Sequence, residues 1–374
     1  MVAGDGLLVR VRPPLARVTL EQALGLCELA QTLGSGMIEL TRRANLQLRG
    51  VRPANHDAVL KALCQLGLVD QDPVREAWPA VLVAPGWQQG DDTHRIASTL
   101  VSRLGELPCL PSKFGFAVDV GAAPVLTAAS ADVRIERSRT GGLIVRADGA
   151  PAGHLVSPGD DVAVDALLAM AAWFAATAAS VEPPSKRMRL HQQVCSLPRA
   201  DGALEAAAAP AALPEPGMSL LGPVYGVAFG QVEASALSQL LRDSGAVAMR
   251  LTPQRGLILE GGQWRESAAF LTSATDFLLR VDACPGAPSC ASATVQTRTV
   301  ARAVALQLNA AGCSSPFSLH VSGCAKGCAR VAAADLTLVG RNGAFDLVRQ
   351  GRAWDLPAVE ALSFENLCQH IGVP

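Results

Sequence analysis

The feature that most constrains this chain is a set of four cysteines in its last quarter. Two of them bracket five residues in Cys284-Pro-Gly-Ala-Pro-Ser-Cys290, and two bracket three residues in Cys324-Ala-Lys-Gly-Cys328. Four thiolates are the complement that holds one 4Fe–4S cube, whereas zinc ribbons usually space each ligand pair more tightly. The alternatives are four unrelated buried cysteines or two disulfides. The paired spacing favours the cluster.

The residues around these cysteines predict how the chain presents them. Pro285 and Pro288 stiffen the turn that carries the first pair. Cys290 opens an Ala/Val-rich run over 291–311 that predicts a helix, and amides at a helix N-terminus favour a thiolate. The second pair follows a strand-like segment over 317–321. Both pairs are therefore expected on loops next to regular elements.

Composition limits the classes of function that the chain can serve. Its 374 residues are enough for two or three domains with real cores. The formal net charge of −1 argues against a general nucleic-acid binder. Most of the positive charge is arginine, which suits bidentate binding of carboxylates. The four lysines are Lys61, Lys113, Lys186 and Lys326.

The remaining cysteines and the apolar segments predict a reduced cytoplasmic location. Residues 1–6 lack the pattern of a signal peptide, because Asp5 interrupts the apolar stretch. The longest apolar run, over 163–179, is too short and too rich in alanine for a membrane span, so no membrane is expected. Six further cysteines are scattered among apolar neighbours, as free core thiols are: Cys27, Cys64, Cys109, Cys195, Cys313 and Cys368.

An internal repeat predicts the architecture. Residues 40–48, Leu-Thr-Arg-Arg-Ala-Asn-Leu-Gln-Leu, match residues 251–259, Leu-Thr-Pro-Gln-Arg-Gly-Leu-Ile-Leu, and each stretch reads as a hairpin. A helix precedes each hairpin, the first one starting at the capping box of Thr19 and Gln22. Two small α+β units are therefore expected, and each precedes a larger α+β domain.

The expected boundaries follow from this repeat. They are a first ferredoxin-like repeat over 1–68, a larger α+β domain over 69–198, an Ala/Pro-rich linker over 199–216, a second ferredoxin-like repeat over 217–279 and a cluster-binding α+β domain over 280–374.

The cysteine spacing, with Ser-Gly-Cys-x-x-Gly-Cys at its second half, resembles the sulfite and nitrite reductase superfamily. The resemblance implies an α+β fold with a duplicated sulfite/nitrite reductase-like architecture, made of two ferredoxin-like half domains and two larger α+β domains. It also implies a 4Fe–4S cluster, whose last cysteine bridges it to a sirohaem iron in the reductases. The ligands implied are Cys284, Cys290, Cys324 and Cys328.

Three basic residues inherit a substrate-binding role from the same resemblance, toward the carboxylates of a tetrapyrrole. Arg43 lies in Thr-Arg-Arg-Ala-Asn-Leu-Gln, similar to a motif whose arginine binds the tetrapyrrole or an anion above it. Arg75 lies where the family places a second such arginine, although Glu76 replaces the usual asparagine. Lys113 belongs to Leu-Pro-Ser-Lys-Phe-Gly, in which Gly115 replaces a second lysine. The residues alone also allow a solvated hairpin arginine at position 43.

Other candidates stay open at the level of sequence. The run Lys186-Arg187-Met188-Arg189 either contacts tetrapyrrole carboxylates or forms a solvated face, and Arg255 is a candidate through the repeat alone. The histidines form no metal-ligand spacing, and His320 is expected to be structural. No catalytic residue is assigned.

Within the superfamily, the chain is similar to the precorrin-3B synthases. The similarity lies in residues 4–13, 110–115 and 250–253 and in the short length of the chain. It implies an oxygen-dependent monooxygenase that hydroxylates precorrin-3A at C20 and forms a γ-lactone. It also implies a mononuclear non-haem iron beside the cluster and an external electron donor, either ferredoxin or an NAD(P)H-dependent reductase.

Two other functions remain open. One is a sirohaem-dependent sulfite or nitrite reductase with a shortened chain. The other is an electron carrier that uses the cluster alone, although a carrier needs neither the duplicated scaffold nor the basic hairpins. The visible spectrum of the purified protein discriminates sirohaem from an iron–sulfur cluster.

Overall fold

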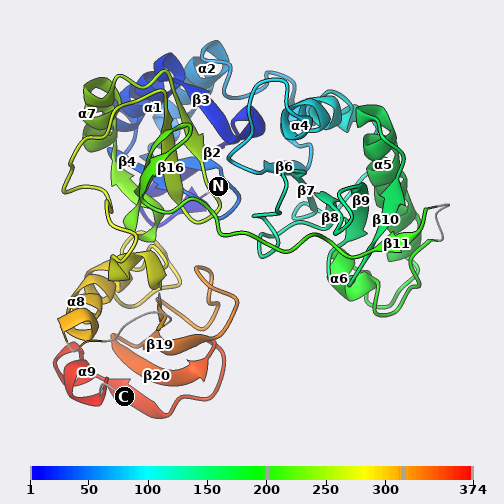
Figure 1. Cartoon of the computed structure of the whole chain (residues 1–374). Coiled ribbons are helices and arrows are strands. Elements are labelled where there is room, and N and C mark those ends of the chain that lie inside the picture. The colour runs from blue at the N-terminus through cyan, green and yellow to red at the C-terminus, as the bar shows by residue number, and fades with distance from the viewer. Residues whose placement is uncertain (1, 199–201, 311, 313–316, 372–374) are drawn as a thin grey trace.

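A computed structural model describes residues 2–198, 202–310, 312 and 317–371 of the chain. Three lobes are visible in Figure 1. The central lobe contains both repeats, the first in blue and the second in green to yellow. The chain leaves the central lobe for a lobe that runs from α4 to β11, returns, and then enters the orange and red lobe that ends the chain. Each repeat is thus followed by a larger lobe.

The first repeat supplies most of a five-stranded antiparallel sheet, against which α1 packs. Helix α1 begins at the predicted capping box: the Thr19 amide donates to the Gln22 side chain at 2.9 Å, and the Gln22 amide donates to Thr19 Oγ1 at 3.2 Å. The elements are β1 (Val2–Ala3), β2 (Gly6–Val11), β3 (Arg17–Thr19), α1 (Leu20–Leu33), β4 (Met37–Leu40), β5 (Leu46–Val51) and α2 (His56–Gln65).

The second repeat has the same order of elements. They are β12 (Gly217–Ser219), β13 (Gly222–Gly226), β14 (Gln231–Glu233), α7 (Ala234–Ser244), β15 (Ala248–Leu251) and β16 (Gly256–Glu260). The two repeats exchange a strand, because β3 pairs with β15 and β14 pairs with β4. Helices α1 and α7 pack together over one shared hydrophobic core. Neither sheet is complete without the other repeat.

The two hairpin turns have the same geometry, which confirms the repeat. In the first turn Ala44 has φ 51°, and Thr41 Oγ1 accepts a hydrogen bond from the Asn45 amide at 3.2 Å. In the second turn Arg255 has φ 63°, and Thr252 Oγ1 accepts from the Gly256 amide at 3.0 Å. The threonine in each turn thus stabilises a left-handed residue that a side chain disfavours.

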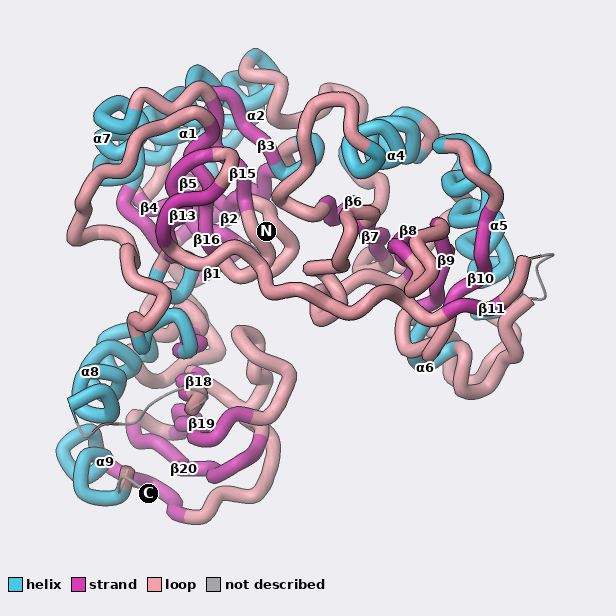
Figure 2. The backbone as a smooth tube through the Cα atoms, viewed as in Figure 1, coloured by secondary structure: helices cyan, strands magenta, loops and turns pink. Residues whose placement is uncertain are grey.

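The lobe after the first repeat contains a six-stranded mixed sheet, covered by α4 and α5 (Figure 2). Strands β6, β7 and β8 are parallel. Strand β9 is antiparallel to β8, and β10 is antiparallel to β9. The segment expected as a linker adds the edge strand β11. The elements are α3 (Pro73–Glu76), β6 (Ala80–Val83), α4 (Asp92–Ser102), β7 (Gly115–Asp119), β8 (Val133–Arg137), β9 (Leu143–Ala147), β10 (Gly153–Val156), α5 (Asp160–Ala178), α6 (Met188–His191) and β11 (Leu204–Glu205).

Helix α5 is, among the described residues, the one helix long and apolar enough by length and composition to cross a membrane. Its Leu167, Ala171 and Phe174 are fully buried, and the helix packs on β8 and β9. This packing is that of a core helix in a globular domain.

The last lobe repeats the order of the first large lobe. Strands β17, β18 and β19 are parallel. Strand β20 is antiparallel to β19, and β21 is antiparallel to β20. Helix α8 packs on β17 and β18, while α9 packs on β20 and β21. The elements are β17 (Val281–Ala283), α8 (Thr297–Ala310), β18 (Leu319–Ser322), β19 (Ala334–Arg341), β20 (Ala344–Gly351), β21 (Val359–Leu362) and α9 (Phe364–His370).

The strand registers show that the duplication includes these larger lobes. Val83 pairs with Val118 in the first, and Ala283 pairs with Val321 in the second. The next residues are Ala84-Pro85-Gly86 in the first lobe and Cys284-Pro285-Gly286 in the second. The first half therefore carries the same turn with alanine at the position of the first cysteine.

An ion pair at equivalent positions of the two repeats has its charges reversed. Arg49 contacts Glu39 at 3.3 Å in the first repeat, and Arg250 contacts Glu260 at 3.2 Å in the second. Both arginines are buried. Breaking such a buried pair costs about 3–5 kcal/mol, so each pair helps to fix its hairpin.

Each of these buried arginines also holds a turn of a larger lobe. Arg49 donates to the Ser289 carbonyl at 2.9 Å, within the first cysteine turn. Arg250 donates to the Pro85 carbonyl at 3.1 Å, within the equivalent turn of the first half. The position of the cysteine turn is therefore determined by the central lobe.

The predicted helix over 291–311 starts later than expected. Helix α8 begins at Thr297, and the alanine-rich residues before it form turns against the cysteine loops. Ala293 packs where a side chain at Gly323 would lie, and Lys326 donates to Ser292 Oγ at 3.0 Å. These contacts override the helix propensity of alanine. Cys290 is therefore not at a helix N-terminus, and that argument for its thiolate is wrong.

The cysteines outside the predicted cluster set are free where the structure describes them. Cys27 is buried, Cys64 and Cys195 are half-buried, and Cys109 is exposed. Burial raises the pKa of the Cys27 thiol to about 12. Cys313 lies outside the described residues.

Candidate functional site

The four predicted cluster cysteines follow two neighbouring parallel strands. Cys284 comes directly after β17, and Cys324 comes two residues after β18. Strands β17 and β18 are parallel, so their carboxyl ends meet at one edge of the sheet. Ligands in open α/β sheets bind at this edge. The fold therefore brings the two cysteine loops together.

Two glycines let these loops pack closely. The Gly323 amide donates to Cys284 Sγ at 3.1 Å, and a Cβ on Gly323 would lie 2.5 Å from the Ala293 Cβ. Gly286 has φ 69°, and its Cβ would lie 2.7 Å from the Thr297 amide nitrogen. A side chain at either position would push the loops apart.

The four thiols lie within electrostatic reach of one another. The pKa of Cys328 is raised, mainly by burial and further by the negative charges of Cys324, Cys284 and Cys290. None of the four is in a disulfide. Among the described residues, no group of three or more His, Cys, Asp or Glu side chains approaches closely enough to hold a metal ion. The fold thus brings the two cysteine loops together, and the described residues show no closed ligand group there.

The structure brings Arg43 and Lys113 together. The hairpin turn between β4 and β5 presents Arg43, and its Nη2 donates to the Lys113 carbonyl at 2.9 Å. The Lys113 side chain is exposed, and no hydrogen bond or ion pair of its ammonium occurs within the described part of the chain. Gly115 starts β7 directly after this contact, and a Cβ there would lie 3.1 Å from the Ala80 carbonyl.

The surroundings of Arg43 carry an excess of positive charge. Its pKa is lowered, mainly by burial, and the charges of Arg187 and Arg10 lower it further, while Asp132 opposes them. Asp132 is already occupied, because Arg187 Nε donates to it at 2.9 Å. A bound carboxylate would relieve this repulsion, so the geometry suits an anionic ligand.

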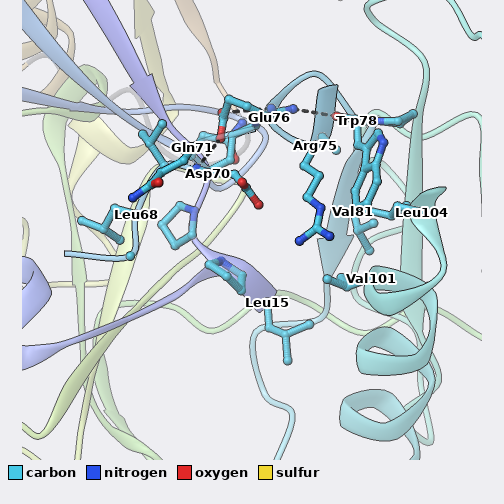
Figure 3. Close-up of a pocket in the computed structure, with 18 residues that line it drawn as sticks. Leu15, Leu68, Asp70, Gln71, Arg75, Glu76, Trp78, Val81, Val101 and Leu104 are labelled. Carbon is cyan, nitrogen blue, oxygen red and sulfur yellow. Dashed lines mark hydrogen bonds and ion pairs between the residues drawn. The ribbon is translucent and has the colours of Figure 1, made fainter. Parts of the chain in front are cut away.

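Arg75 lies in a neighbouring pocket rather than beside Arg43. This pocket has a volume of about 570 Å³ and shares Asn45 with the hairpin turn of Arg43. Figure 3 shows the Arg75 side chain extending toward Leu15 and Val81. Its side chain is 61% exposed, and its ion pair with Asp72 is long at 3.9 Å. The Arg75 guanidinium is thus available to a ligand in this pocket.

The basic run at 186–189 divides into different roles. Arg189 pairs with Asp148 through two hydrogen bonds of 3.1 and 3.0 Å. Arg187 is held by Asp132 and acts on Arg43 electrostatically. Lys186 is exposed. Of these three, Arg187 is the one that adjoins the predicted substrate residues.

The similarity of this chain to known proteins supports one family. Residues 1–66 match the family model of the nitrite/sulfite reductase ferredoxin-like half domain. A protein of Sinorhizobium sp named precorrin-3B synthase is 32% identical over 391 residues, which cover 96% of this chain and 82% of that protein. The chain belongs to the precorrin-3B synthase family.

A solved structure shares the fold of this chain. The solved structure of the Mycobacterium tuberculosis NirA protein superposes with a TM-score of 0.68 at 16% identity, covering 97% of this chain and 79% of that chain. This likeness and the match of residues 1–66 confirm the duplicated α+β architecture. Membership in the precorrin-3B synthase family makes the chain an oxidoreductase enzyme.

Asp282 joins the central lobe to the last lobe, and the sequence patterns did not identify it. Asp282 is buried two residues before Cys284, and its carboxylate accepts from Arg42, Arg255 and Arg330. Arg42 and Arg255 come from the two hairpin turns. A signal was available, since a charged residue in the middle of the short strand Val-Asp-Ala requires buried partners.

His320 is buried next to this group and stays neutral. Its pKa is lowered to about 4, mainly by burial, and the charges of Arg330, Arg42 and Arg255 lower it further. Neither ring nitrogen has a hydrogen-bond partner among the described residues. The expectation that His320 is structural stays a prediction.

Proposed function

We propose that this chain is an oxygen-dependent monooxygenase of cobalamin biosynthesis that converts precorrin-3A to precorrin-3B. The observation that carries the proposal is the identity of 32% with a protein named precorrin-3B synthase across nearly the whole chain. In the proposed reaction C20 gains a hydroxyl group, and an acetate side chain closes a γ-lactone on C1.

The proposed reaction needs an external source of electrons. One atom of dioxygen enters the substrate, and an electron pair with two protons reduces the other atom to water. The chain lacks a Gly-x-Gly-x-x-Gly fingerprint for a flavin or nicotinamide cofactor. The electrons therefore come from a separate donor, either ferredoxin or an NAD(P)H-dependent reductase.

Cys284, Cys290, Cys324 and Cys328 would hold a 4Fe–4S cluster. The fit rests on four free thiols on two loops that meet at one edge of the sheet, and on the Gly323 amide, which donates to Cys284 Sγ. Amide donors to sulfur stabilise the extra electron of a reduced cluster. When bound, such a cluster passes one electron at a time.

The described residues provide no set of ligands for a mononuclear iron. The described part of the chain has no group of three or more His, Cys, Asp or Glu side chains that could hold a metal ion. His320, the histidine nearest to the cysteine loops in sequence, is fully buried. The proposal therefore assigns no protein ligand to such an iron.

Arg43, Lys113 and Arg75 would bind the acetates and propionates of the tetrapyrrole. Arg43 uses one N–H on the Lys113 carbonyl and has others left for a carboxylate. Each charge-assisted contact contributes about 1.5–3 kcal/mol. Together these groups would orient the macrocycle, because they come from separate elements.

A sirohaem-dependent sulfite or nitrite reductase is the second candidate. The match of residues 1–66 to the nitrite/sulfite reductase ferredoxin-like half domain favours it. Against it stands Gly115, where the resemblance expects a lysine, because reduction of a small anion needs a dense cationic pocket. Sharp sirohaem bands in the visible spectrum would favour the reductase, and a broad iron–sulfur absorption would favour the synthase.

Turnover of the purified protein tests the proposal. With precorrin-3A and a reductant, we expect precorrin-3B in air and none under anaerobic conditions. Sulfite and nitrite should be reduced slowly or not at all. Rapid reduction of sulfite, without any change in precorrin-3A, would assign the chain to the reductases.

A further inference from the structure

Another pocket lies at the opposite end of strands β17 and β18 from the cysteines. Its volume is about 290 Å³, and its lining includes Val281 and Ser318. These residues lie at the amino ends of β17 and β18, whereas the cysteine loops leave the carboxyl ends. We call it the Asp282 pocket.

The Asp282 pocket is strongly basic. Four arginines line it, and Asp282 is the one acidic residue in the lining. Both oxygens of Asp282 are occupied, since Oδ1 accepts from Arg42 and Arg255 and Oδ2 accepts from Arg330. One carboxylate therefore serves three guanidinium groups, and the fourth, Arg280, is not among them.

The electrostatics show which charge is missing. The Asp282 carboxylate accepts hydrogen bonds from three arginines, so its negative charge is well compensated. The pKa of Arg255 is lowered, mainly by burial, and the charges of Arg42 and Arg298 lower it further while Asp282 opposes them. Asp282 has three arginine partners, whereas the four arginines of the pocket share this single carboxylate. The pocket has room for a further anion.

Arg280 and Arg42 supply the free donors. Nη1 of Arg280 is buried without a hydrogen-bond partner among the described residues, and its guanidinium stacks over Phe277 at 4.6 Å. The Arg42 side chain is 53% exposed and uses one of its N–H groups on Asp282. A buried unpaired donor is costly and commonly marks a missing ion.

The internal duplication places a similar pocket at the equivalent position of the first half. Phe229 and residues 278–281 line the Asp282 pocket, and the equivalent Leu15 and residues 78–81 line the pocket that contains Arg75. Both pockets form where the first loop of a repeat meets the first strand of the following lobe. Both contain an arginine with donors to spare.

We propose that the Asp282 pocket binds an oxyanion between Arg42 and Arg280. A free phosphate and a carboxylate side chain of a tetrapyrrole share this chemistry, and the pocket volume admits either group. The inference does not depend on the reaction proposed above, because it concerns binding at a site away from the cysteines.

Calorimetric titration with inorganic phosphate, at constant ionic strength with chloride, tests this site. The Arg43→Ala variant is used as the background, so that the basic cluster at Arg43 does not contribute. We expect phosphate binding that Arg280→Gln weakens about tenfold or more. Among the described residues Arg280 forms no ion pair, and its Nη1 has no hydrogen-bond partner, so the substitution should change the fold little. Arg139→Gln, an exposed arginine elsewhere, is the matched control.

Absence of phosphate binding in the Arg43→Ala background would overturn the proposal. So would an Arg280→Gln protein that binds phosphate as tightly as its parent. Repeating the titration with uroporphyrin, an octacarboxylate tetrapyrrole, separates the two sources. Competition between the ligands assigns the site to a carboxylate of the tetrapyrrole, and independent binding assigns it to a free anion.

Discussion

Replacing Asp282 by asparagine should loosen the edge of the last sheet that carries the cysteines. The substitution keeps the shape and removes the one carboxylate shared by three arginines. Arg255 is then left with its charge buried, since its side chain is only 10% exposed. The side chains of Arg42 and Arg330 are 53% and 24% exposed, so they can turn toward water and add little to the cost. Uncompensated burial of one charge costs about 3–5 kcal/mol.

Hydrogen exchange measured by mass spectrometry detects this change locally. Amides of β17 and β18 should exchange roughly 100- to 4,000-fold faster if the full cost falls on their local opening. Helix α1, which lies in the central lobe, serves as the internal reference and should be unchanged. A local measurement is preferable, because a chain with several lobes need not unfold in one step.

Asp346→Asn is the matched control for this prediction. Asp346 is equally buried on the same sheet, but it pairs with a single arginine, Arg341, whose side chain is 62% exposed. Its loss should cost less than about 1 kcal/mol. If Asp282→Asn changed exchange in β17 and β18 no more than Asp346→Asn does, the reasoning about the shared carboxylate would be refuted.

Substitutions at three further positions test other parts of the site. Arg43→Ala should weaken tetrapyrrole binding about 10- to 150-fold in a fluorescence titration without changing iron content, and Arg43→Lys should recover part of the loss; unchanged affinity would make Arg43 a solvated turn residue. Gly323→Ala places a Cβ 2.5 Å from the Ala293 Cβ, so we expect less iron per chain, and a full iron content would show that the loops can shift. His320 has its pKa lowered to about 4 from 6.5, so the stability that depends on its neutral form is fully present above pH 6.5 and is lost as the pH falls toward 4. His320→Gln should flatten this decline, which amounts to about 3 kcal/mol in urea titrations; an equal decline in both proteins would place the titrating group elsewhere.

Local patterns in the sequence predicted the parts of the fold that depend on neighbouring residues. The capping box at Thr19 forms as expected, and the hairpin motif at 40–48 and 251–259 adopts one turn geometry twice. These features follow from hydrogen bonds between residues a few positions apart. The cysteine spacing likewise predicted two loops that the parallel strands bring together. Which groups those thiols ligate stays a prediction.

Features that depend on distant contacts could not be predicted from local patterns. The exchange of β3 and β14 between the repeats is set by packing across the shared core. Residues 291–296 look helical by composition, yet contacts with the second cysteine loop hold them as turns. The role of Asp282 depends on arginines that are 27 to 240 positions away.

Labelled dioxygen tests the central claim most directly. The protein would be supplied with precorrin-3A, a reductant and isotopically heavy dioxygen in ordinary water, and the corrinoid product would be analysed by mass spectrometry. We predict that the new hydroxyl oxygen carries the heavy isotope. A product whose added oxygen comes only from water would contradict the assignment as a monooxygenase.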